Sequence, residues 1–501
     1  MRTPAPIIRI KCRRRQYIMK KYGIITDAIL AKLREVVKDE DRIAVGDKVN
    51  PEYSQDKMPI YGVHAPDVAI DALTTEEVSG IMKICNDNDI PVTVRGNGTG
   101  LVGGAVAMFG GILISTFRMN KVLKWDDEHF AAHIQPGILL GDLQRLSLER
   151  GLMYAPDPAN RKATVGGNVS TNAGGMRAIK YGTTREYVRG MTAVLPNGEV
   201  IKLGANVSKN STGLNLIQLI ASSFGTLAVI TELTMKLLKA PSVSHSVMAP
   251  FEDLDTALSV VPEILKAGLR PTAIEFFEKE VLYFSEEYVG KKVWPREVDG
   301  KKIGAYLLML FDGDDEAEVR TQTARMEAFF YKNKAMSAHV VEDADEQSEI
   351  WAARAAMLTA IFEQHKCYDE NDAVIPINNI AEFIRFTKIS GEKYDFDVFS
   401  VGHAGDGNMH IFSASNDLTL EAFKKQSHEW MLELYAKAKE LGGELSGEHG
   451  VGNGKIGYFE HYVGPRVFEL NQEIKRLFDP KLILNPGKLC FYPEKMEEYR
   501  N

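Results

Sequence analysis

The sequence lacks several features that would assign it to a specialised class of protein. It has only four cysteines among 501 residues, Cys12, Cys85, Cys367 and Cys490, and no two of them form a CxxC pair. Such isolated cysteines exclude a local iron–sulfur or cysteine-type zinc site, and they favour a reducing cytoplasm over a secreted disulfide scaffold. No uninterrupted apolar run approaches the roughly 18 residues of a transmembrane helix. Positive charge is not in excess either: the net charge is -8 and the pI about 5.9. This balance argues against nucleic acid or an anionic membrane as the main partner.

The bulk composition is that of a globular protein with more than one domain. Hydrophobic residues make up 45% and charged residues 26% of the chain, and 501 residues are too many for a single core. Residues 1–22 are basic and contain no acid, and their apolar stretch is too short for a secretory signal. They are either a targeting arm or upstream residues read through before a start at Met19. We expect this extension to be disordered.

Two kinds of pattern divide the chain near residue 240. Thr74 and Glu77 form a capping box, and the apolar residues behind them predict a helix over 75–88. A strand over 90–95 then enters a region rich in glycine, asparagine and threonine. After residue 240 the patterns alternate, with helices expected at 254–268 and 315–333 and strands at 272–277 and 305–311. This alternation predicts an α+β domain with a sheet covered on one face.

Two glycine-rich segments can hold a dinucleotide. Gly98–Gly103 matches the GxGxxG motif of dinucleotide-binding loops. The segment that follows, 104–111, is too short and too rich in glycine to form the long helix of a Rossmann site, and no acidic residue follows at the end of a next strand. We therefore exclude NAD binding here. Residues 95–104 and 165–175 nevertheless allow backbone N–H groups to point into one concavity. Either segment alone is equally well explained as a pair of tight turns. Together they are suited to the two ends of a long dinucleotide.

A second constellation, of histidines and a carboxylate, predicts a metal site. Asp406-Gly407 lies between two strand-like runs and predicts a hairpin that brings His403 and His410 together. Glu448 and His449 follow on a glycine-rich bend. Two imidazoles and one carboxylate leave open coordination positions, which is the arrangement of a catalytic metal. Because neighbours in extended backbone point opposite ways, we expect Glu448 to face the metal and His449 to face the substrate. Any one of these histidines alone is more simply explained as a structural residue.

These segments carry a family resemblance. Residues 53–238 resemble the FAD-binding domain of the vanillyl-alcohol oxidase and p-cresol methylhydroxylase flavoprotein superfamily, through PVTVRGNGTGLVGG, PDPANRKATVGGNVSTNAGG, KYGTTREYV and FGTLAVIT. The resemblance implies FAD, with the first segment at its pyrophosphate and the second along its isoalloxazine. Thr99 stands where covalent members carry histidine, so we expect non-covalent FAD. Phe224 departs from the usual Gly-Ser-Glu-Gly. The implied cofactor residues are Arg95, Gly96, Asn97, Gly98, Thr99, Gly100, Gly103, Gly104, Pro156, Asp157, Gly166, Gly167, Asn168, Thr171, Asn172, Gly174, Gly175, Tyr181, Gly182, Ile230 and Asn485.

From about Ile24 the chain resembles the D-lactate dehydrogenase and glycolate oxidase branch of that superfamily. GHAGDGNMH and SGEHGVGNGK resemble the metal and active-site motifs of the branch. The resemblance implies that His403, His410 and Glu448 bind one divalent metal, with zinc first and iron(II) or manganese as alternatives. It implies Asn408 as a substrate contact and His449 as the catalytic base and a substrate contact. Arg354, in Trp-Ala-Ala-Arg, resembles the arginine that binds the substrate carboxylate, although a solvated surface charge is the alternative.

The expected architecture and activity follow from this resemblance. The fold class is α+β: a two-part FAD-binding domain at 23–240, a substrate or cap domain with the metal site at 241–475, and a tail at 476–501 that returns to the FAD domain. The expected reaction is the FAD-dependent oxidation of a small D-2-hydroxy acid, D-lactate first, with glycolate or D-2-hydroxyglutarate as alternatives. Electrons then pass to a quinone, an electron-transferring flavoprotein or an iron–sulfur subunit. An oxygen-reducing oxidase and a flavin electron-transfer subunit of a larger complex also remain open, as does a homo-oligomer.

Overall fold

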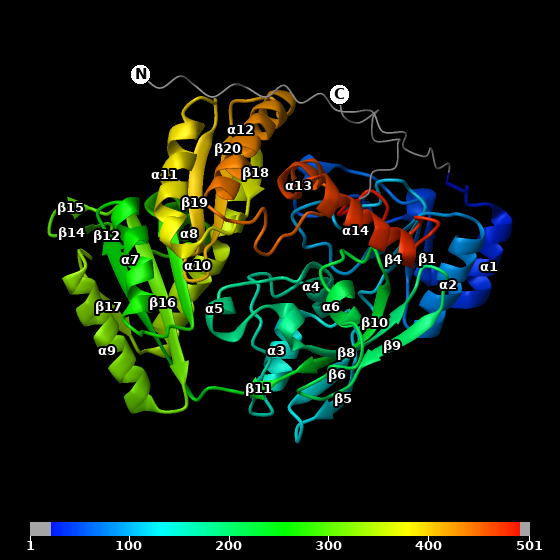
Figure 1. The fold of residues 1–501 in the computed structure, drawn as a ribbon, viewed down its shortest axis with the longest axis horizontal. Coiled ribbons are helices and arrows are strands. Elements are labelled where there is room, and N and C mark those ends of the chain that lie inside the picture. Colours follow the sequence, from blue (N-terminus) through cyan, green and yellow to red (C-terminus); the bar gives the residue numbers. More distant parts are fainter. Residues whose placement is uncertain (1–21, 491–501) are drawn as a thin grey trace.

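The structure, a computed structural model, describes residues 22–490, so the expected disordered extension lies outside it except for Tyr22. Figure 1 shows three larger sheets, two formed by strands between residues 43 and 236 and one by strands between 243 and 415. The first sheet has the order β1-β2-β4-β3, in which β2, β4 and β3 are parallel. Its strands are β1 Ile43–Val45, β2 Val68–Asp71, β3 Val92–Arg95 and β4 Ile112–Ser115.

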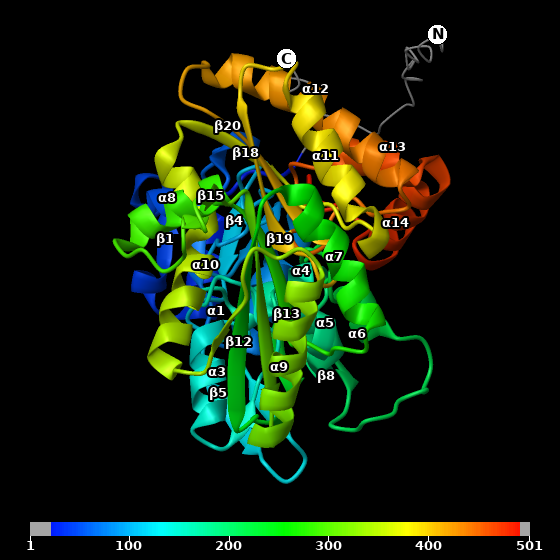
Figure 2. The same cartoon turned by 90° about the vertical axis from the view of Figure 1, so that its left-hand side faces the viewer.

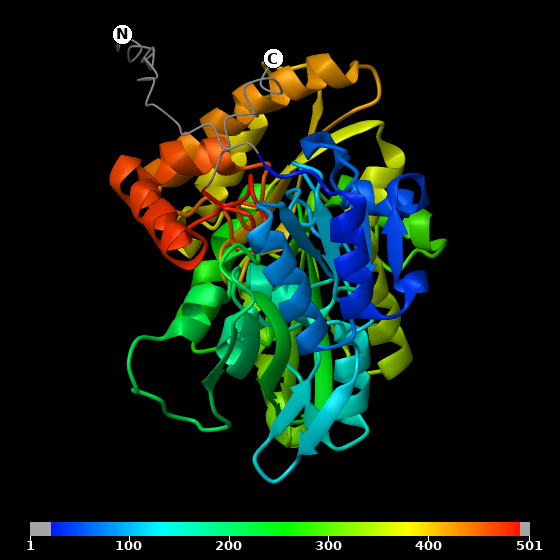
Figure 3. The same ribbon diagram turned by 90° about the vertical axis from the view of Figure 1, so that its right-hand side faces the viewer.

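Two helices, α1 (Asp27–Val37) and α2 (Thr75–Asp87), bury their apolar faces in one core with this first sheet. Figure 3 views the molecule from their side. Helix α2 confirms the predicted helix to within one residue, and Thr74 caps it by accepting from the Glu77 backbone N–H. The Glu77 carboxylate accepts from Leu73 N at 2.8 Å and pairs with Arg42 at 2.8 Å. The Glu77 side chain therefore accepts from the backbone N–H of Leu73, the residue before the N-cap, rather than from that of Thr74 as a capping box predicts.

The second sheet is antiparallel and has the order β5-β6-β10-β8-β9. Its strands are β5 Val122–Asp126, β6 Ala131–Ile134, β8 Val188–Val194, β9 Val200–Gly204 and β10 Val229–Lys236. Buried residues of α3 (Leu140–Leu148), α4 (Val165–Thr171) and α6 (Leu216–Ile220) share its core. A short helix, α5 (Ala178–Tyr181), and the two-stranded pair β7 (Leu152–Met153) and β11 (Leu238–Lys239) complete this part.

The third sheet is fully antiparallel, with the order β17-β12-β16-β13-β19-β20-β18. Its strands are β12 Val243–Phe251, β13 Ala273–Glu278, β16 Ala305–Gly313, β17 His339–Val341, β18 Cys367–Asn371, β19 Asp397–His403 and β20 Asn408–Ser415. Between β13 and β16 in the sequence, β14 (Glu297–Val298) and β15 (Lys301–Lys302) form a separate two-stranded sheet. The predicted strands at 272–277 and 305–311 correspond to β13 and β16. The predicted hairpin is β19 and β20, with His403 opposite Asn408.

Helices cover both faces of this sheet, so the expectation of a single covered face is wrong. Phe276 and Leu307 join a core with α7 (Leu254–Lys266), α9 (Glu316–Lys332), α11 (Ile380–Gly391) and α12 (Leu420–Glu440). Their neighbours Phe277 and Leu308 join a separate core with α8 (Lys279–Val289) and α10 (Ala344–Gln364). Figure 2 shows β12 between α9 and α10. Successive strand side chains point to opposite faces, and here both sets are apolar.

The C-terminal segment returns to the first sheet. After α13 (Ile456–Val463) and α14 (Pro465–Phe478), Leu484 bridges Val92 in parallel, and the Asn485 side chain accepts from Val94 N at 2.9 Å. The α+β fold class with a returning tail is therefore confirmed. The assignment of 23–240, 241–475 and 476–501 to separate domains stays a prediction. No helix among residues 22–490 combines the length and apolar character needed to span a membrane.

Candidate active site

One cavity is lined by both glycine-rich segments. It is bordered by residues of each segment and by distant parts of the chain, including His449 of the predicted metal region. The predicted cofactor residues in its wall are Gly96, Asn97, Gly98, Thr99, Gly100, Gly104, Gly166, Gly167, Asn168, Thr171, Ile230 and Asn485. The predicted base and the predicted cofactor positions therefore face the same space.

The second glycine segment is not a loop throughout, since Val165–Thr171 forms helix α4. Thr164 caps this helix by accepting from Gly167 N at 3.3 Å. A side chain at Gly166 would place its Cβ 2.4 Å from Pro136 Cβ, and one at Gly96 would place its Cβ 2.1 Å from Thr164 Oγ1. These two glycines allow the first segment, the Pro136 turn and α4 to pack closely around the cavity.

Other predicted cofactor residues lie outside the cavity wall. Arg95 is buried and donates to the carbonyls of Gln55 at 2.9 Å and Glu52 at 3.0 Å. Tyr181 donates to Asp312 Oδ1 at 2.9 Å. The remaining residues outside the lining are Gly103, Pro156, Asp157, Asn172, Gly174, Gly175 and Gly182. The structure gives Arg95 and Tyr181 protein partners, and contact of any of these residues with a cofactor stays a prediction.

Phe224, the departure from the family pattern, lies at the junction of three segments. Its backbone is left-handed, with φ 54°, and its carbonyl accepts from the Asn485 side chain at 2.6 Å. Its ring would be 3.1 Å from a Cβ at Gly104 and 2.4 Å from a Cβ at Gly450. The ring therefore fills the space between the first glycine segment and the bend that carries His449.

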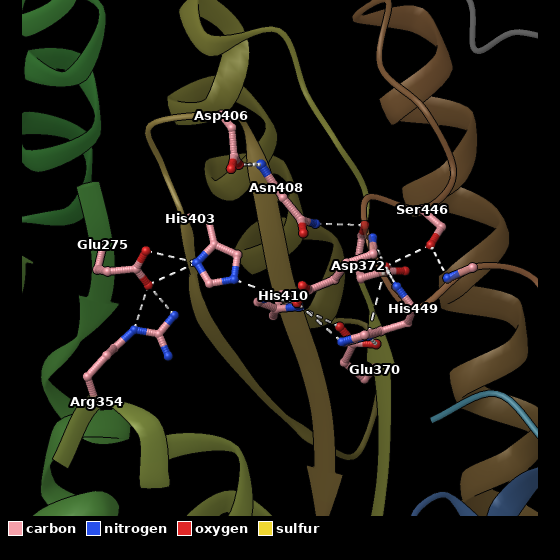
Figure 4. Close-up of polar contacts among 12 residues, drawn as sticks. Glu275, Arg354, Glu370, Asp372, His403, Asp406, Asn408, His410, Ser446 and His449 are labelled. Carbon is pink, nitrogen blue, oxygen red and sulfur yellow. Dashed lines mark hydrogen bonds and ion pairs between the residues drawn. The ribbon is translucent and has the colours of Figure 1, made fainter. Parts of the chain in front are cut away.

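Three imidazoles and one carboxylate converge at the end of the third sheet (Figure 4). The Oε1 atom of Glu448 lies 3.6 Å from His403 Nε2, 3.2 Å from His410 Nε2 and 3.4 Å from His449 Nε2. His403 and His410 come from the paired strands β19 and β20, and their rings are 5.3 Å apart. The hairpin therefore brings together two of the three residues that the sequence predicts as ligands.

Each of the three imidazoles is held at its other nitrogen by a buried acid that the sequence analysis missed. Glu275, opposite His403 in the β13–β19 register, accepts from His403 Nδ1 at 2.8 Å. Glu370 accepts from His410 Nδ1 and from His449 Nδ1, both at 2.9 Å. Hydrogen bonds of this kind orient imidazole ligands and raise their basicity. The available signal was an acid within an otherwise apolar strand, most clearly at Glu275.

Arg354, predicted to bind the substrate carboxylate, is buried on α10 and pairs with Glu275. Its Nε donates to Glu275 Oε2 at 2.8 Å, and this pair lies on the side of His403 away from His410 (Figure 4). Asn408, the other predicted substrate contact, donates its amide to the Asp372 carbonyl at 3.0 Å. Both side chains thus have partners within the protein, and their contact with a substrate stays a prediction.

Asp372 anchors the bend that carries the carboxylate and the base. Its Oδ2 accepts from the backbone N–H of Glu448 at 3.1 Å, from that of His449 at 2.8 Å and from Ser446 Oγ at 2.7 Å. Its Oδ1 pairs with the buried Lys455 ammonium at 2.6 Å. The sequence analysis assigned no role to Asp372 or Lys455, because residues 372 and 446–455 become neighbours only through the fold.

The expected opposite orientation of Glu448 and His449 is wrong. Residues 447–449 form a bend rather than an extended strand, so the alternation of side chains does not apply. Both side chains point toward the same place, with His449 Nε2 3.4 Å from Glu448 Oε1. His449 stacks on His410 with ring centroids 5.1 Å apart and also lines the cavity of the glycine segments. His449 therefore lies between the cavity and the predicted ligands.

The acids dominate the electrostatics of the cluster. Burial favours neutral His403, but Glu275 and Glu448 outweigh it and raise the pKa of His403 to about 10. Burial likewise opposes protonation of His449, and Glu370 and Asp372 reverse this and raise its pKa well above the ordinary value. Burial disfavours ionised Glu448, yet the three histidines hold its pKa well below its usual range. The electrostatic environment of the cluster thus strongly favours bound positive charge, whether protons or a metal ion.

The donor set fits a divalent metal. Within residues 22–490, two groups have ligand atoms close enough to share one ion: His403, His410 and Glu448, and Glu370, His410 and His449. The first group uses the Nε2 atoms, whose rings are anchored at Nδ1. In the second group, Glu370 is already the acceptor of the hydrogen bonds from His410 Nδ1 and His449 Nδ1. The Lys455 ammonium also lies 3.8 Å from Glu370 Oε2. A cation beside this acid disfavours a second ion there, so the first group fits better.

Comparisons with known proteins identify the family of the chain. Residues 66–204 match the FAD binding domain family, and residues 240–489 match the C-terminal domain of FAD linked oxidases. D-lactate dehydrogenase of Anaerostipes hadrus is 46% identical to this chain over 471 residues, covering 94% of this chain and 99% of that protein. Glycolate oxidase subunit GlcD of Bacillus subtilis is 34% identical, covering 87% and 91%. D-2-hydroxyglutarate dehydrogenase of Stutzerimonas stutzeri is 29% identical, covering 92% and 98%.

Solved structures show the same fold at lower sequence identity. A substrate-bound p-cresol methylhydroxylase superposes with a TM-score of 0.76 at 20% identity, covering 92% of this chain and 96% of that one. An alkyldihydroxyacetonephosphate synthase gives a TM-score of 0.71 at 20% identity, covering 94% and 86%. The resemblance stated from the glycine and histidine motifs is therefore confirmed.

Proposed function

Since the chain belongs to the family of FAD-linked oxidases, we propose that it is a metal-assisted dehydrogenase that oxidises D-lactate to pyruvate. The observation that carries the proposal is the convergence of three Nε2 atoms on Glu448 Oε1, beside the cavity lined by both glycine segments. Oxidation of a hydroxy acid needs a proton acceptor and a hydride acceptor on either side of one carbon. The cluster supplies the first, and the cavity is suited to the second.

We assign the ligand and cofactor positions as follows. His403, His410 and Glu448 hold one divalent metal, zinc first, which as a Lewis acid lowers the pKa of a substrate hydroxyl. Bound FAD supplies the acceptor for the Cα hydride. Thr99 lies in the cavity wall and has no nucleophilic nitrogen for a flavin bond. FAD is therefore non-covalent and should be released when the protein is denatured.

His449 is the proposed base. Its Nδ1 donates to Glu370 at 2.9 Å, so in the neutral ring, the form that a bound cation beside it favours, Nε2 carries the free electron pair that accepts the hydroxyl proton. Asp372 holds the His449 backbone N–H at 2.8 Å and thereby fixes the position of the ring. The Phe224 ring packs against the next residue of this bend, Gly450, on the cavity side.

The charges around the cluster favour a monocarboxylate substrate. Two cationic side chains contact the buried acids, Arg354 at Glu275 and Lys455 at Asp372, and each already has its partner. One substrate carboxylate can share the metal and the outer side of the Arg354 guanidinium. Among residues 22–490 no Lys or Arg other than these two pairs with the acids of the cluster, so a second carboxylate, as in 2-hydroxyglutarate, would find no further cationic partner of this kind there. We therefore propose D-lactate rather than a dicarboxylate.

The electron acceptor is proposed to be a separate molecule. The described cysteines Cys85, Cys367 and Cys490 are buried and unpaired, and none belongs to a group of potential metal ligands among residues 22–490. A quinone, an electron-transferring flavoprotein or an iron–sulfur subunit can take this role. Peroxide formation with D-lactate would instead identify an oxidase. A wild-type protein that no hydroxy acid reduces would identify an electron-transfer subunit.

The variant His449→Ala tests the assignment of the base. It should keep bound FAD and metal but lose about 100- to 10,000-fold in the rate of anaerobic flavin reduction by D-lactate, since a positioned base contributes a factor of this size. His339→Ala is the matched control, because His339 is exposed and pairs only with Glu346 on the surface. A His449→Ala protein that is reduced as fast as the wild type would show that the base is assigned wrongly.

A further inference from the structure

We propose that Glu370 is a positioning residue that sets the tautomers of His410 and His449 at the same time, so that one carboxylate prepares both a metal-ligand nitrogen and the proton-accepting nitrogen. The inference rests on the proposed function, in which His410 is a ligand and His449 the base. It adds a coupling, in which the metal-ligand nitrogen and the proton-accepting nitrogen depend on the same carboxylate.

The geometry at Glu370 is symmetric. Its Oε1 accepts from His410 Nδ1 at 2.9 Å, and its Oε2 accepts from His449 Nδ1 at 2.9 Å. The two rings are nearly parallel, with an interplanar angle of 25°. Figure 4 shows Glu370 below His410 and His449, and the Nδ1 atoms of both rings are turned toward it. The carboxylate thus uses one oxygen for each ring.

This arrangement leaves only one tautomer for each ring. An ionised carboxylate has no hydrogen to donate, so both Nδ1 atoms must carry a hydrogen. When a bound cation displaces the extra protons that the surrounding acids favour, each imidazole is neutral and has one hydrogen, so both Nε2 atoms are left with a free electron pair. Those Nε2 atoms lie 3.2 and 3.4 Å from Glu448 Oε1. Glu370 therefore points two electron pairs at the place where the metal and the substrate hydroxyl are expected.

The surroundings hold Glu370 in this position. It lies on β18, opposite Phe412 of β20, the strand that also carries His410. Its side chain is completely buried, and the Lys455 ammonium lies 3.8 Å from Oε2. This cation adds a favourable charge beside the buried acid without occupying the position of either imidazole. The acid therefore remains an acceptor toward both rings.

Glu275 offers an internal comparison. Both of its oxygens lie near a single imidazole nitrogen, His403 Nδ1, at 2.8 and 3.0 Å. Replacing either glutamate by glutamine substitutes one oxygen with an NH₂ group. In the Glu275→Gln variant the remaining side-chain oxygen can take the position of Oε2, which lies within hydrogen-bond distance of both His403 Nδ1 and Arg354 Nε. In the Glu370→Gln variant the remaining oxygen can turn to only one of the two rings, and the other ring must move its hydrogen to Nε2.

This difference gives unequal responses to added metal. Metal binding to Glu370→Gln selects the side-chain orientation that leaves His410 Nε2 free, which places the NH₂ group at His449 and disables the base. At saturating zinc, Glu370→Gln should remain about 100- to 10,000-fold slower than wild type in flavin reduction by D-lactate. Glu275→Gln should bind zinc about 10- to 100-fold more weakly, and saturating zinc should raise its rate of flavin reduction more than it raises that of Glu370→Gln.

The experiment compares both variants and Glu370→Asp as holoproteins. Bound FAD and zinc are quantified, the zinc affinity is measured by competition with a chromogenic chelator, and flavin reduction is followed anaerobically. Glu370→Gln should also bind zinc about 10- to 100-fold more weakly, a readout that does not depend on the substrate. Glu370→Asp keeps two acceptor oxygens and should be faster than Glu370→Gln at saturating zinc.

Two results for Glu370→Gln would overturn the inference. One is a Glu370→Gln protein with wild-type zinc affinity; the other is one that zinc restores as fully as Glu275→Gln. A Glu370→Asp protein as slow as Glu370→Gln would equally show that side-chain size, rather than acceptor chemistry, is what matters. If wild-type protein is not reduced by D-lactate, the proposed function fails, while the zinc affinities still test the effect of Glu370 on His410.

Discussion

The substitution Gly96→Ala should loosen the wall of the cofactor cavity. An added Cβ at residue 96 would lie 2.1 Å from Thr164 Oγ1, which caps helix α4 through Gly167 N. Thr164 must therefore move and lose its capping bond, at a cost of about 1 kcal/mol. Crowding in a packed region adds about 1–3 kcal/mol. The expected loss of about 2–4 kcal/mol corresponds to a fall in Tm of roughly 4–16 °C for a domain of about 200 residues.

Gly100→Ala provides the matched control in the same segment. Its Cβ would meet only Asp56 Oδ2, at 3.8 Å, which is ordinary contact. Thermal unfolding of the FAD-free proteins separates the packing effect from any direct contact with the cofactor. We expect Gly96→Ala to unfold at lower temperature and to be purified with less FAD, and Gly100→Ala to unfold near the wild-type temperature. Equal unfolding temperatures for the two variants would refute the reasoning.

Three further predictions concern the cluster and its supports. Asp372→Asn breaks the buried pair with Lys455 at 2.6 Å and should lower the free energy of unfolding by about 3–5 kcal/mol in urea titrations; an unchanged midpoint would contradict this. Tyr61→Phe removes a 2.6 Å bond to the buried Asp369 and should cost about 1–3 kcal/mol in the same assay, whereas a neutral result would show the bond to be dispensable. Without metal, Glu275 and Glu448 overcome burial and raise the pKa of His403 to about 10, so a proton must leave when zinc binds. Zinc affinity measured by equilibrium dialysis should therefore rise between about pH 7 and pH 10, and a flat profile would contradict this assignment.

The sequence was sufficient for features determined by local chemistry. Asp406-Gly407 predicted the turn between β19 and β20, and Gly407 has a φ of 88° there. Thr74 predicted the start of α2, which begins at Thr75. Apolar runs predicted β13 and β16, since their residues are buried whichever strand they pair with. These features depend on neighbours within a few residues.

Features that depend on long-range pairing could not be predicted in the same way. Glu275 meets His403 only because β13 and β19 are adjacent in the third sheet, and no local pattern gives that strand order. The orientation of Glu448 and His449 depends on Asp372, which holds the backbone of both. The covering of both sheet faces was missed because α8 and α10 pack onto the face opposite α7 and α9. A pattern of alternating elements does not say on which face each helix lies.

The most direct test of the central claim is anaerobic flavin reduction by D-lactate in protein with and without bound metal. The account predicts that metal-loaded wild-type protein loses its flavin absorption band on mixing with D-lactate. It further predicts that protein stripped with a chelator keeps its FAD and its band, and that added zinc restores reduction. Reduction that proceeds equally well after the metal is removed would contradict the claim that His403, His410 and Glu448 hold a metal that the reaction requires.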